Sequence, residues 1–255
     1  MVILVRIGMA NDKVYIHEFI DIIGHNRANY MHHMTANWSP IAQAARHQLC
    51  YGVWGTVGST RRWPEVVNIW EEDGYPGLVA SFRHEFNHPS LQDPALAAWW
   101  ARAAQFRRSG LDRILVPAPW TDPIEELCAK GVRGETYAHE VIKVPGGTAW
   151  DFLERVGERA VPAHEAFGWK LAGAWATAMC NESEVLLLWA IPTWDAWGEF
   201  EAAERTDAGI LGWRKEATEV VTDWQRFLLV DSPLSPFRTG RQPQESDRDS
   251  FQLPD

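Results

Sequence analysis

Tyr15-Ile16-His17-Glu18, near the start of the chain, returns 122 residues later as Tyr137-Ala138-His139-Glu140. Gly24 and Gly146 follow at the same offset, and each ends its run with a turn residue. Three further pairs of segments match in the same order: YGVWGTVG around Trp54 with LAGAWATA around Trp175, VVNIWEE around Trp70 with VLLLWAI around Trp189, and DRILVPAP near Arg113 with QRFLLVDSP near Arg226. Four matches in one order indicate an internal duplication.

Each copy carries the pattern β-α-β-β-α-β, which is the ferredoxin-like arrangement. Alternation and helical periodicity predict the elements from the residue types. A break is expected at Pro40 in the first helix, because proline cannot donate an intrahelical hydrogen bond. The expected elements are strands 14–20, 48–57, 66–71 and 113–116 with helices 26–47 and 96–108, then strands 136–142, 170–178, 185–191 and 226–230 with helices 149–167 and 208–225.

The predicted fold class is α+β. One four-stranded sheet of this kind leaves a bare face, which would be an aggregation hazard. Two halves in one chain remove the hazard by packing sheet to sheet as a pseudo-symmetric barrel. We expect an N-terminal half at 1–121, a linker at 122–134, a C-terminal half at 135–234 and a flexible polar tail at 235–255.

These motifs resemble the NIPSNAP family of the dimeric α+β barrel superfamily. The matching features are the strand followed by VPGG (144–147), VLLLW (185–189) and the endings LLVDSPLSP and ILVPAPWTDP. The resemblance spans about residues 12–235 and implies the barrel fold. Where the family places an arginine on the first strand, this chain has His17 and His139. Cofactor-free monooxygenases, EthD-like proteins and haem-dependent chlorite dismutase relatives share the architecture.

The composition excludes several classes of protein. Asp and Glu outnumber Lys and Arg by 34 to 24, so the basic footprint of a nucleic-acid binder is missing. We expect no membrane partner, because no apolar run reaches the ~20 residues that a spanning helix needs. Three widely spaced cysteines and the absence of a secretory signal favour the cytoplasm. A homodimer is compatible with the sequence.

His17 and His139 are the first catalytic candidates, because duplication places them at equivalent positions. Strand alternation puts Tyr15, His17 and Phe19 on one face and Ile16, Glu18 and Ile20 on the other. An imidazole inside the barrel could act as acid or base near neutral pH. The alternative is a buried histidine bonded to a backbone carbonyl. The aromatic residues predicted to contact a hydrophobic or aromatic small molecule are Tyr15, Trp54, Trp70, Tyr137, Trp175 and Trp189.

His32 and His33 occur in the first half only, which suggests a site there. Adjacent histidines on a helix point about 100° apart, so only one of them can face a cavity.

His84-Glu85-Phe86-Asn87-His88 matches the zinc-hydrolase motif H-E-x-x-H. Pro89 follows at once, so a helix end exposed to solvent is the favoured interpretation, and His84, Glu85 and His88 are weak metal candidates. His164 is a candidate axial ligand in a haem-binding alternative.

The leading hypothesis is a small-molecule enzyme of biosynthesis that uses histidine as acid and base and needs no cofactor. Its expected substrate is a hydrophobic oxygenated metabolite, and the expected reaction is oxygenation, isomerisation or cyclisation. One alternative is a haem- or divalent-metal-dependent enzyme of the same superfamily. Another is a non-catalytic ligand-binding or assembly protein. No phosphate loop, G-x-G-x-x-G turn or G-x-S-x-G elbow supports nucleotide cofactors or serine hydrolysis.

Overall fold

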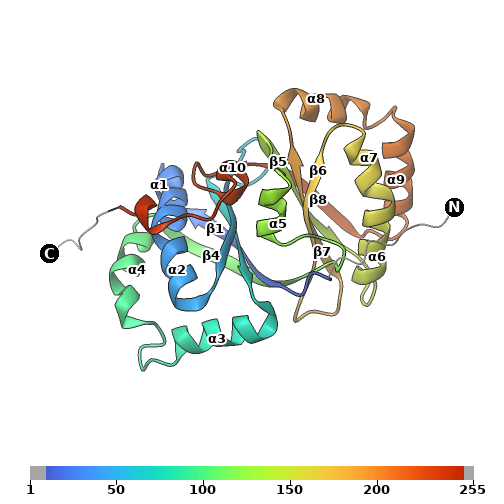
Figure 1. Ribbon diagram of the computed structural model, residues 1–255. Coiled ribbons are helices and arrows are strands. Elements are labelled where there is room, and N and C mark those ends of the chain that lie inside the picture. Colours follow the sequence, from blue (N-terminus) through green and yellow to red (C-terminus); the bar gives the residue numbers. More distant parts are fainter. Residues whose placement is uncertain (1–9, 250–255) are drawn as a thin grey trace.

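The computed structural model describes residues 10–249 and contains a closed barrel of eight antiparallel strands with helices on its outside (Figure 1). The strands run β1-β3-β2-β8-β5-β7-β6-β4 around the barrel. Each half contributes four, and three residue pairs at each of β2–β8 and β4–β6 join the halves. The predicted α+β barrel is therefore confirmed. The strands are β1 Val14–Ile22, β2 Leu49–Thr56, β3 Glu65–Glu72, β4 Arg107–Pro117, β5 Thr136–Lys143, β6 Lys170–Thr177, β7 Glu184–Ile191 and β8 Asp223–Asp231.

The long helices cover the outer faces of the two sheets, one set on each side of the barrel (Figure 1). No helix within residues 10–249 is long and apolar enough to cross a bilayer. The helices are α1 Arg27–His32, α2 Ser39–Arg46, α3 Gly74–Phe86, α4 Ala97–Ala104, α5 Ile124–Ala129, α6 Ala149–Arg155, α7 Val161–Glu165, α8 Trp194–Ala203, α9 Ala208–Thr218 and α10 Pro236–Thr239, with π-helical segments at His33–Trp38 and Val156–Ala160 and 3₁₀ turns at Pro94–Leu96 and Glu245–Asp247.

The break expected at Pro40 does not occur. The helix continues through it, because the π-helical segment His33–Trp38 comes directly before and Pro40 lies in the first turn of α2. The hydrogen bonds there run five residues back, as from the Ser39 N–H to the Met34 oxygen, and such π-helical turns are where a helix accommodates an interruption of its usual ladder. The second half has the same arrangement, with the π-helical segment Val156–Ala160 just before Pro162.

Three packed layers make up the core: the barrel interior and one sheet–helix layer in each half. The alternation of β1 is as expected, with Tyr15 and Phe19 in the interior cluster and Ile20 in the outer one. Trp54 and Trp175 each fold back over a glycine of their own strand, and a Cβ atom at Gly52 or Gly173 would overlap the indole. The duplicated G-x-W pattern thus has a packing cause in both copies.

One end of the barrel is closed by α5, from the predicted linker, and by α10, from the predicted tail (Figure 1). Phe237 of α10 is 2% exposed and packs among interior aromatic residues. Farther along, the Gln242 side chain bonds to the backbone N and O of Cys50, at 2.9 and 2.8 Å. The flexible tail expected from composition is therefore not what residues 235–249 form: they pack on the barrel. Residues 250–255 lie outside the described part.

Candidate active site

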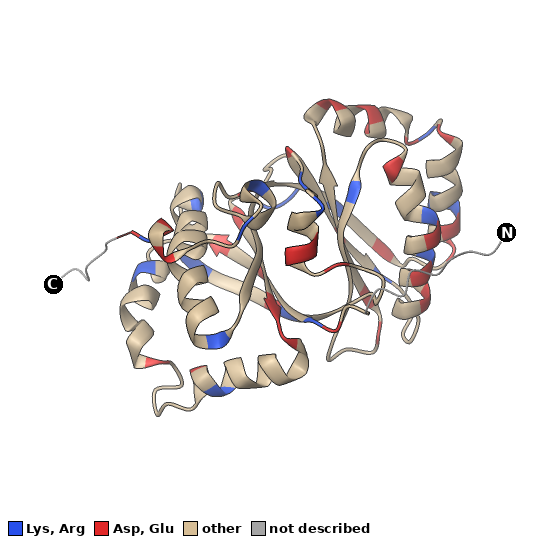
Figure 2. Cartoon of the chain, viewed as in Figure 1, with Lys and Arg blue, Asp and Glu red and all other residues tan. Residues whose placement is uncertain are grey.

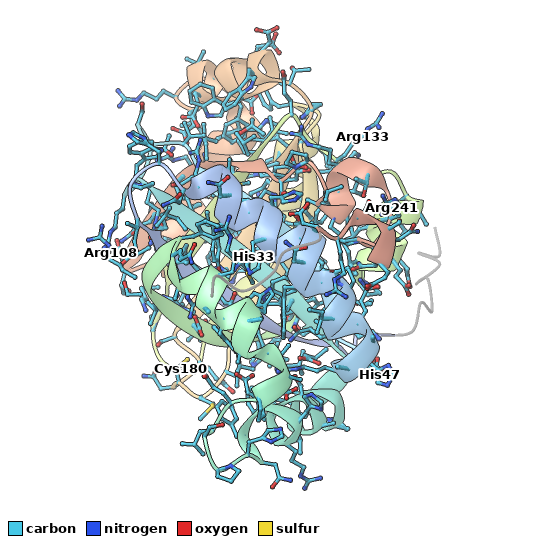
Figure 3. The ribbon with its side chains drawn as sticks, turned by 90° about the vertical axis from the view of Figure 1, so that its left-hand side faces the viewer. His33, His47, Arg108, Arg133, Cys180 and Arg241 are labelled. Carbon is cyan, nitrogen blue, oxygen red and sulfur yellow. The ribbon has the colours of Figure 1, made fainter. Side chains whose placement is uncertain are left out.

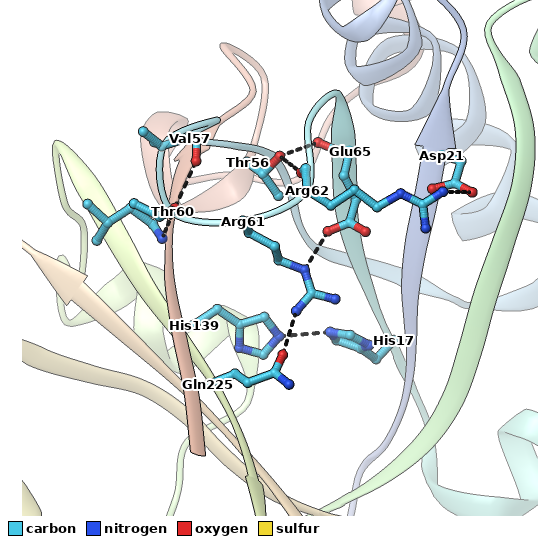
Figure 4. Close-up of polar contacts among 11 residues, drawn as sticks. His17, Asp21, Thr56, Val57, Thr60, Arg61, Arg62, Glu65, His139 and Gln225 are labelled. Atoms are coloured by element: carbon cyan, nitrogen blue, oxygen red, sulfur yellow. Dashed lines mark hydrogen bonds and ion pairs between the residues drawn. The ribbon is translucent and has the colours of Figure 1, made fainter. Parts of the chain in front are cut away.

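His17 and His139 meet at the centre of the barrel (Figure 4). Their Nε2 atoms are 2.8 Å apart, and both side chains are fully buried. Nδ1 of His139 lies 2.8 Å from the backbone oxygen of Leu187, which can only accept, so Nδ1 carries the hydrogen. The Nε2 atom of His139 therefore accepts from Nε2–H of His17. Nδ1 of His17 is left without a partner among residues 10–249.

Burial keeps both imidazoles neutral at pH 7. It lowers the pKa of His17 well below its usual value, and the neighbouring His139 and Arg113 lower it further. Burial likewise lowers the pKa of His139 to about 4. Arg61 covers the pair, with its guanidinium carbon 4.3 Å from the ring centroid of Phe19 and its Nε 2.7 Å from Glu65 (Figure 4). A catalytic role for the two histidines stays a prediction.

The aromatic residues predicted to contact ligand divide between the two faces of the sheets. Trp54 and Trp175 belong to the barrel-interior cluster, together with the tyrosines of the two repeats, Tyr15 and Tyr137, and all four are at most 1% exposed. The hydroxyl of Tyr15 donates to Glu71 at 3.0 Å. Trp70 and Trp189 point the other way, towards the helices of their halves.

His32 and His33 do point in different directions, as their spacing requires. His33 is buried between α1 and α4, where its ring stacks on Trp99 at 5.0 Å (Figure 3). Burial lowers the pKa of His33 to about 4. His32 lies at the surface and pairs with Asp249 at 2.8 Å. The role of either residue in a site remains a prediction.

The H-E-x-x-H segment forms the end of α3, which stops at Phe86, two residues earlier than the motif. His84 lies 3.0 Å and His88 3.9 Å from the carboxylate of Asp93, while Glu85 binds Arg46 at 2.7 Å. Across residues 10–249, no three His, Cys, Asp or Glu side chains are grouped so that they could hold a metal ion.

His164 is enclosed by aromatic rings. The centroid of its ring lies 4.0 Å from that of Trp189 and 4.9 Å from that of Phe200. Its Nδ1 atom is 2.7 Å from the backbone oxygen of Ala160. Its Nε2 is buried and has no partner among the described residues. An axial ligand needs open space for a porphyrin on its free nitrogen, and packed rings surround this imidazole. The residues around His164 therefore do not fit a haem.

A cavity of about 550 Å³ lies instead between the outer face of the first-half sheet and its helices. We call it the outer pocket. Its size is typical of small-molecule sites. The turn after β6, which includes Cys180, contributes to its wall from the second half (Figure 3). The aromatic part of the wall consists of Trp38, Trp70, Phe82, Phe86, Trp99 and Trp100.

Two carboxylates from adjacent strands face this pocket. Glu18 and Asp112 are direct cross-strand partners of β1 and β4, so they lie on the same face, and both line the cavity. The Glu18 Oε2 atom accepts hydrogen bonds from Asn68 at 2.7 Å and from the Trp70 indole at 3.0 Å. Burial raises the pKa of Glu18, and the charge of Asp112 raises it further. We call these two residues the carboxylate pair.

The second half has a different arrangement at the equivalent place. Glu140 accepts from the Trp189 indole at 3.2 Å, as Glu18 does from Trp70, but its cross-strand partner is Arg226, at 2.6 Å. Burial raises the pKa of Glu140, but Arg226, His164 and the Trp189 indole together lower it by more, so the pKa of Glu140 is lowered. The space that is open in the first half holds the packed rings around His164. Duplication thus produced one open half with like charges and one filled half with an ion pair.

A second cavity, of about 670 Å³, lies beside α8, α9 and β8. Its arginines are already paired: Arg226 with Glu140 and with Glu204 at 3.2 Å, and Arg214 with Glu204. Acidic residues are spread over the helices of this half, with Lys and Arg among them (Figure 2). Because its charges are compensated, this larger cavity is a weaker candidate for acid/base chemistry.

Sequence reasoning placed Glu18 on the face opposite His17 but gave it no role. The alignment of the closing strands hid its partner, because it matched Arg113 with Arg226. The sheet register instead makes Asp112 the equivalent of Arg226, since they lie opposite Glu18 and Glu140. The sequence did contain a signal: the repeated glutamate lies opposite an acidic residue, Asp112, in one copy and opposite a basic residue, Arg226, in the other.

No family model and no curated protein matches the chain. Solved structures do. A monooxygenase-like protein of Lactobacillus acidophilus is 9% identical, with 92% of this chain and 97% of that one covered at a TM-score of 0.58. A chlorite dismutase-like protein is 11% identical, with 89% and 98% covered at 0.50. The chain has the dimeric α+β-barrel fold. At such low identity, the likeness shows the fold alone.

The likeness to a NIPSNAP domain protein covers little more than a third of the chain. A NIPSNAP domain protein of Burkholderia xenovorans is 13% identical to this chain, at a TM-score of 0.33. The match covers 37% of this chain and 92% of that protein. NIPSNAP domain proteins are thus among the structural neighbours, and membership of that family stays a prediction.

Proposed function

We propose that this protein is an enzyme that binds a hydrophobic, oxygen-bearing small molecule in the outer pocket and moves a proton with the carboxylate pair. One observation carries the proposal. Two carboxyl groups line an aromatic-walled cavity at the place where the other half holds an ion pair and packed rings. Arg107 also lines this cavity, and its charge lowers the pKa of both carboxyl groups. Like charges in a cleft cost stability, and pairs of titratable groups with shifted pKa values are a mark of functional sites.

The two carboxyl groups are suited to different steps. Glu18 is partly buried and its pKa is raised, which favours its protonated form, and two N–H donors fix its orientation. Burial raises the pKa of Asp112 too, while the charge of Arg107 lowers it, but Asp112 is more exposed than Glu18, so it is the member better placed to be ionised. Glu18 would then donate a proton to the substrate and Asp112 would accept one. A proton transfer of this kind serves isomerisation and cyclisation, and it prepares a substrate for cofactor-independent oxygenation.

The assignment moves the predicted acid/base role from histidine to carboxylate. Burial and neutrality of His17 and His139 at the barrel centre support the move, since neither side chain has exposed surface. The substrate-contacting role predicted for Trp70 is kept, because Trp70 lines the outer pocket.

Proton transfer can be measured without knowing the product. The protein is incubated in D₂O with a panel of hydrophobic alcohols, ketones and acids, and deuterium incorporation and new masses are followed by mass spectrometry. Asp112→Asn and Glu18→Gln should each lower turnover by roughly 10²- to 10⁴-fold. Glu199→Gln, at an exposed helical position, should leave it unchanged.

His17→Gln and His139→Gln, made separately, complete the set. Full turnover in both is expected. Lost turnover in either, with full turnover in Asp112→Asn, would place the chemistry inside the barrel and refute the proposal. Tight binding without any turnover would instead support a non-catalytic binding protein.

A further inference from the structure

Arg46, Arg107 and Arg113 line the outer pocket, and they differ in their partners. Arg46 is paired with Glu85 at 2.7 Å, and Arg113 with Glu184 at 2.7 Å. Arg107 is in ion-pair contact with no carboxylate among the residues that the structure describes, and its side chain is half-buried. Its guanidinium group therefore keeps donors that a ligand in the pocket can use.

A β-bulge at the start of β4 turns Arg107 towards this pocket. At the register shift with β1, Ile22 lies opposite Arg107, whereas the preceding pair is Asp21 with Ser109, so Arg108 is the extra residue of the bulge. Without the bulge, strand alternation would place Arg108 on the outer face of the sheet, opposite Ile22, and Arg107 on the inner face. The equivalent β5–β8 ladder runs without a shift at its paired positions. The half with the open pocket thus has a local change of backbone that re-aims a cation into it, which is a use that bulges have beside active sites.

Neighbouring side chains hold Arg107 at the pocket wall. Its guanidinium carbon lies 5.3 Å from the centroid of the Trp100 ring, and its charge acts on the Tyr30 hydroxyl. The same charge acts on both members of the carboxylate pair, so the guanidinium group lies within electrostatic reach of Glu18 and Asp112. An arginine that is oriented by a ring and keeps free N–H groups suits an oxygen atom that carries negative charge.

The proposed proton transfer creates such an oxygen when the substrate is a ketone or an aldehyde. A C–H bond next to the carbonyl group breaks, its electron pair forms a carbon–carbon double bond, and negative charge moves to the carbonyl oxygen, which gives an enolate. Asp112 receives the proton and becomes neutral as the oxygen becomes negative, so the total charge beside Arg107 does not change. Glu18 then donates its proton to another atom of the enolate. A fixed cation near both positions stabilises the enolate without reorganisation.

We infer that Arg107 binds the carbonyl oxygen of the substrate and stabilises its anionic, enolate form. The inference rests on the proposed function, because it concerns the same pocket and the same proton transfer. It adds a substrate class: a hydrophobic ketone or aldehyde with a hydrogen on the carbon next to its carbonyl group. It also assigns Arg107 as a catalytic residue.

Binding of 4-nitrophenol tests the site for the anionic oxygen, because the ionised oxygen of this probe shares its charge with a planar ring, as an enolate oxygen does with its double bond. The phenolate is yellow and the phenol is not, so the absorbance of the bound probe gives the ratio of the two forms. Equilibrium dialysis against the full chain is carried out at pH 6, where most of the free probe is protonated. The ratio of phenolate to phenol should be about 10- to 100-fold higher for the bound probe than for the free probe. The methyl ether, 4-nitroanisole, cannot ionise and measures binding to the pocket alone.

Variants of β4 locate the effect. Arg107→Met removes the charge, so it should abolish the excess of bound phenolate and leave the affinity for 4-nitroanisole nearly unchanged. Arg107→Lys should retain part of the excess. Arg108→Met, at the exposed neighbouring position, is the matched control and should change neither. Asp112→Asn removes a competing negative charge, so it should keep the phenolate excess although it lowers turnover.

The D₂O assay tests the substrate class. Ketones with a hydrogen next to the carbonyl group should incorporate deuterium, whereas alcohols, and ketones without such a hydrogen, should not. Arg107→Met should lower this exchange about 10²- to 10³-fold, mainly through kcat, because the negative charge on the oxygen develops as the C–H bond breaks.

The outcomes separate this inference from the proposed function. Bound 4-nitroanisole without a phenolate excess, or an excess that Arg107→Met keeps, would overturn the role of Arg107 and leave the pocket in place. A phenolate excess that requires Arg107, together with full turnover in Asp112→Asn, would support the role of Arg107 and refute the carboxylate pair as the proton carrier. Turnover of alcohols but not of ketones would overturn the substrate class. Binding of neither probe would overturn the inference and the outer pocket together.

Discussion

Replacing His139 by Gln should make the protein lose less stability in acid. In the folded state, burial lowers the pKa of this imidazole to about 4, whereas an imidazole in the unfolded chain titrates near 6.5. A group whose folded pKa is lowered binds more protons when unfolded, so its contribution to stability is present above pH 6.5 and is lost as the pH falls towards 4. Between pH 7.5 and 5.0 this one residue accounts for a loss of about 2 kcal/mol in the free energy of unfolding.

The assay is urea denaturation at both pH values, followed by tryptophan fluorescence. The free energy of unfolding of the wild type should fall by about 2 kcal/mol more than that of His139→Gln over this range. The variant will be less stable at pH 7.5, because it disturbs the contact with His17, but the measured quantity is the difference between pH values. His25→Gln, at an exposed position, is the control and should follow the wild type. Parallel pH dependence in wild type and His139→Gln would refute the buried, neutral state of the central imidazole.

Other changes test the barrel end and its packing. Burial raises the pKa of Glu71 to about 7, so the stability linked to its protonated form is lost as the pH rises through 7. Between pH 5 and 8, the free energy of unfolding of Glu71→Gln should therefore fall by about 2 kcal/mol less than that of the wild type, as measured by urea denaturation. Phe237→Ala should cost roughly 3–5 kcal/mol of unfolding free energy if α10 closes the barrel, while Phe86→Ala, at a side chain 52% exposed, should cost far less. Gly52→Ala should lower the melting temperature by the equivalent of roughly 1–3 kcal/mol, and Trp54→Leu should relieve part of that cost in the double variant, because the added methyl group overlaps the indole.

The fold was predictable because its signals are local and occur twice. A single Tyr-x-His-Glu strand is weak, but its return as residues 137–140, followed by three further pairs in order, defines two equal units. Strand alternation then gave the inward position of His17 correctly, since period 2 leaves only two choices. The packing of residues 235–249 was missed because their composition is polar: Phe237 is the buried aromatic side chain, and the other contacts are polar, such as that of Gln242 with the Cys50 backbone and of Arg238 with Asp231.

The site was harder to predict, because it depends on pairing between strands far apart in the chain. Glu18 and Asp112 become neighbours only through the β1–β4 register, and an error of one residue in aligning the closing strands was enough to hide the pair. Whether a cavity is open also depends on side-chain packing that no motif encodes. Trp70 and Trp189 are equivalent in sequence, yet one lines a cavity and the other is covered by His164.

The contrast between the halves also explains why a duplicated barrel would keep only one site. A like-charged pair destabilises the sheet that carries it, and an open cavity forgoes packing that a filled one provides. In the second half, Arg226 compensates Glu140 and the rings around His164 fill the space, so that half stabilises the shared barrel. The first half can then carry the carboxylate pair, which makes no ion pair comparable to that of Glu140 with Arg226 and is compensated only by the nearby charge of Arg107. Changing Asp112 to Arg should therefore raise stability and abolish turnover, whereas changing Arg226 to Asp should lower stability without creating an open pocket.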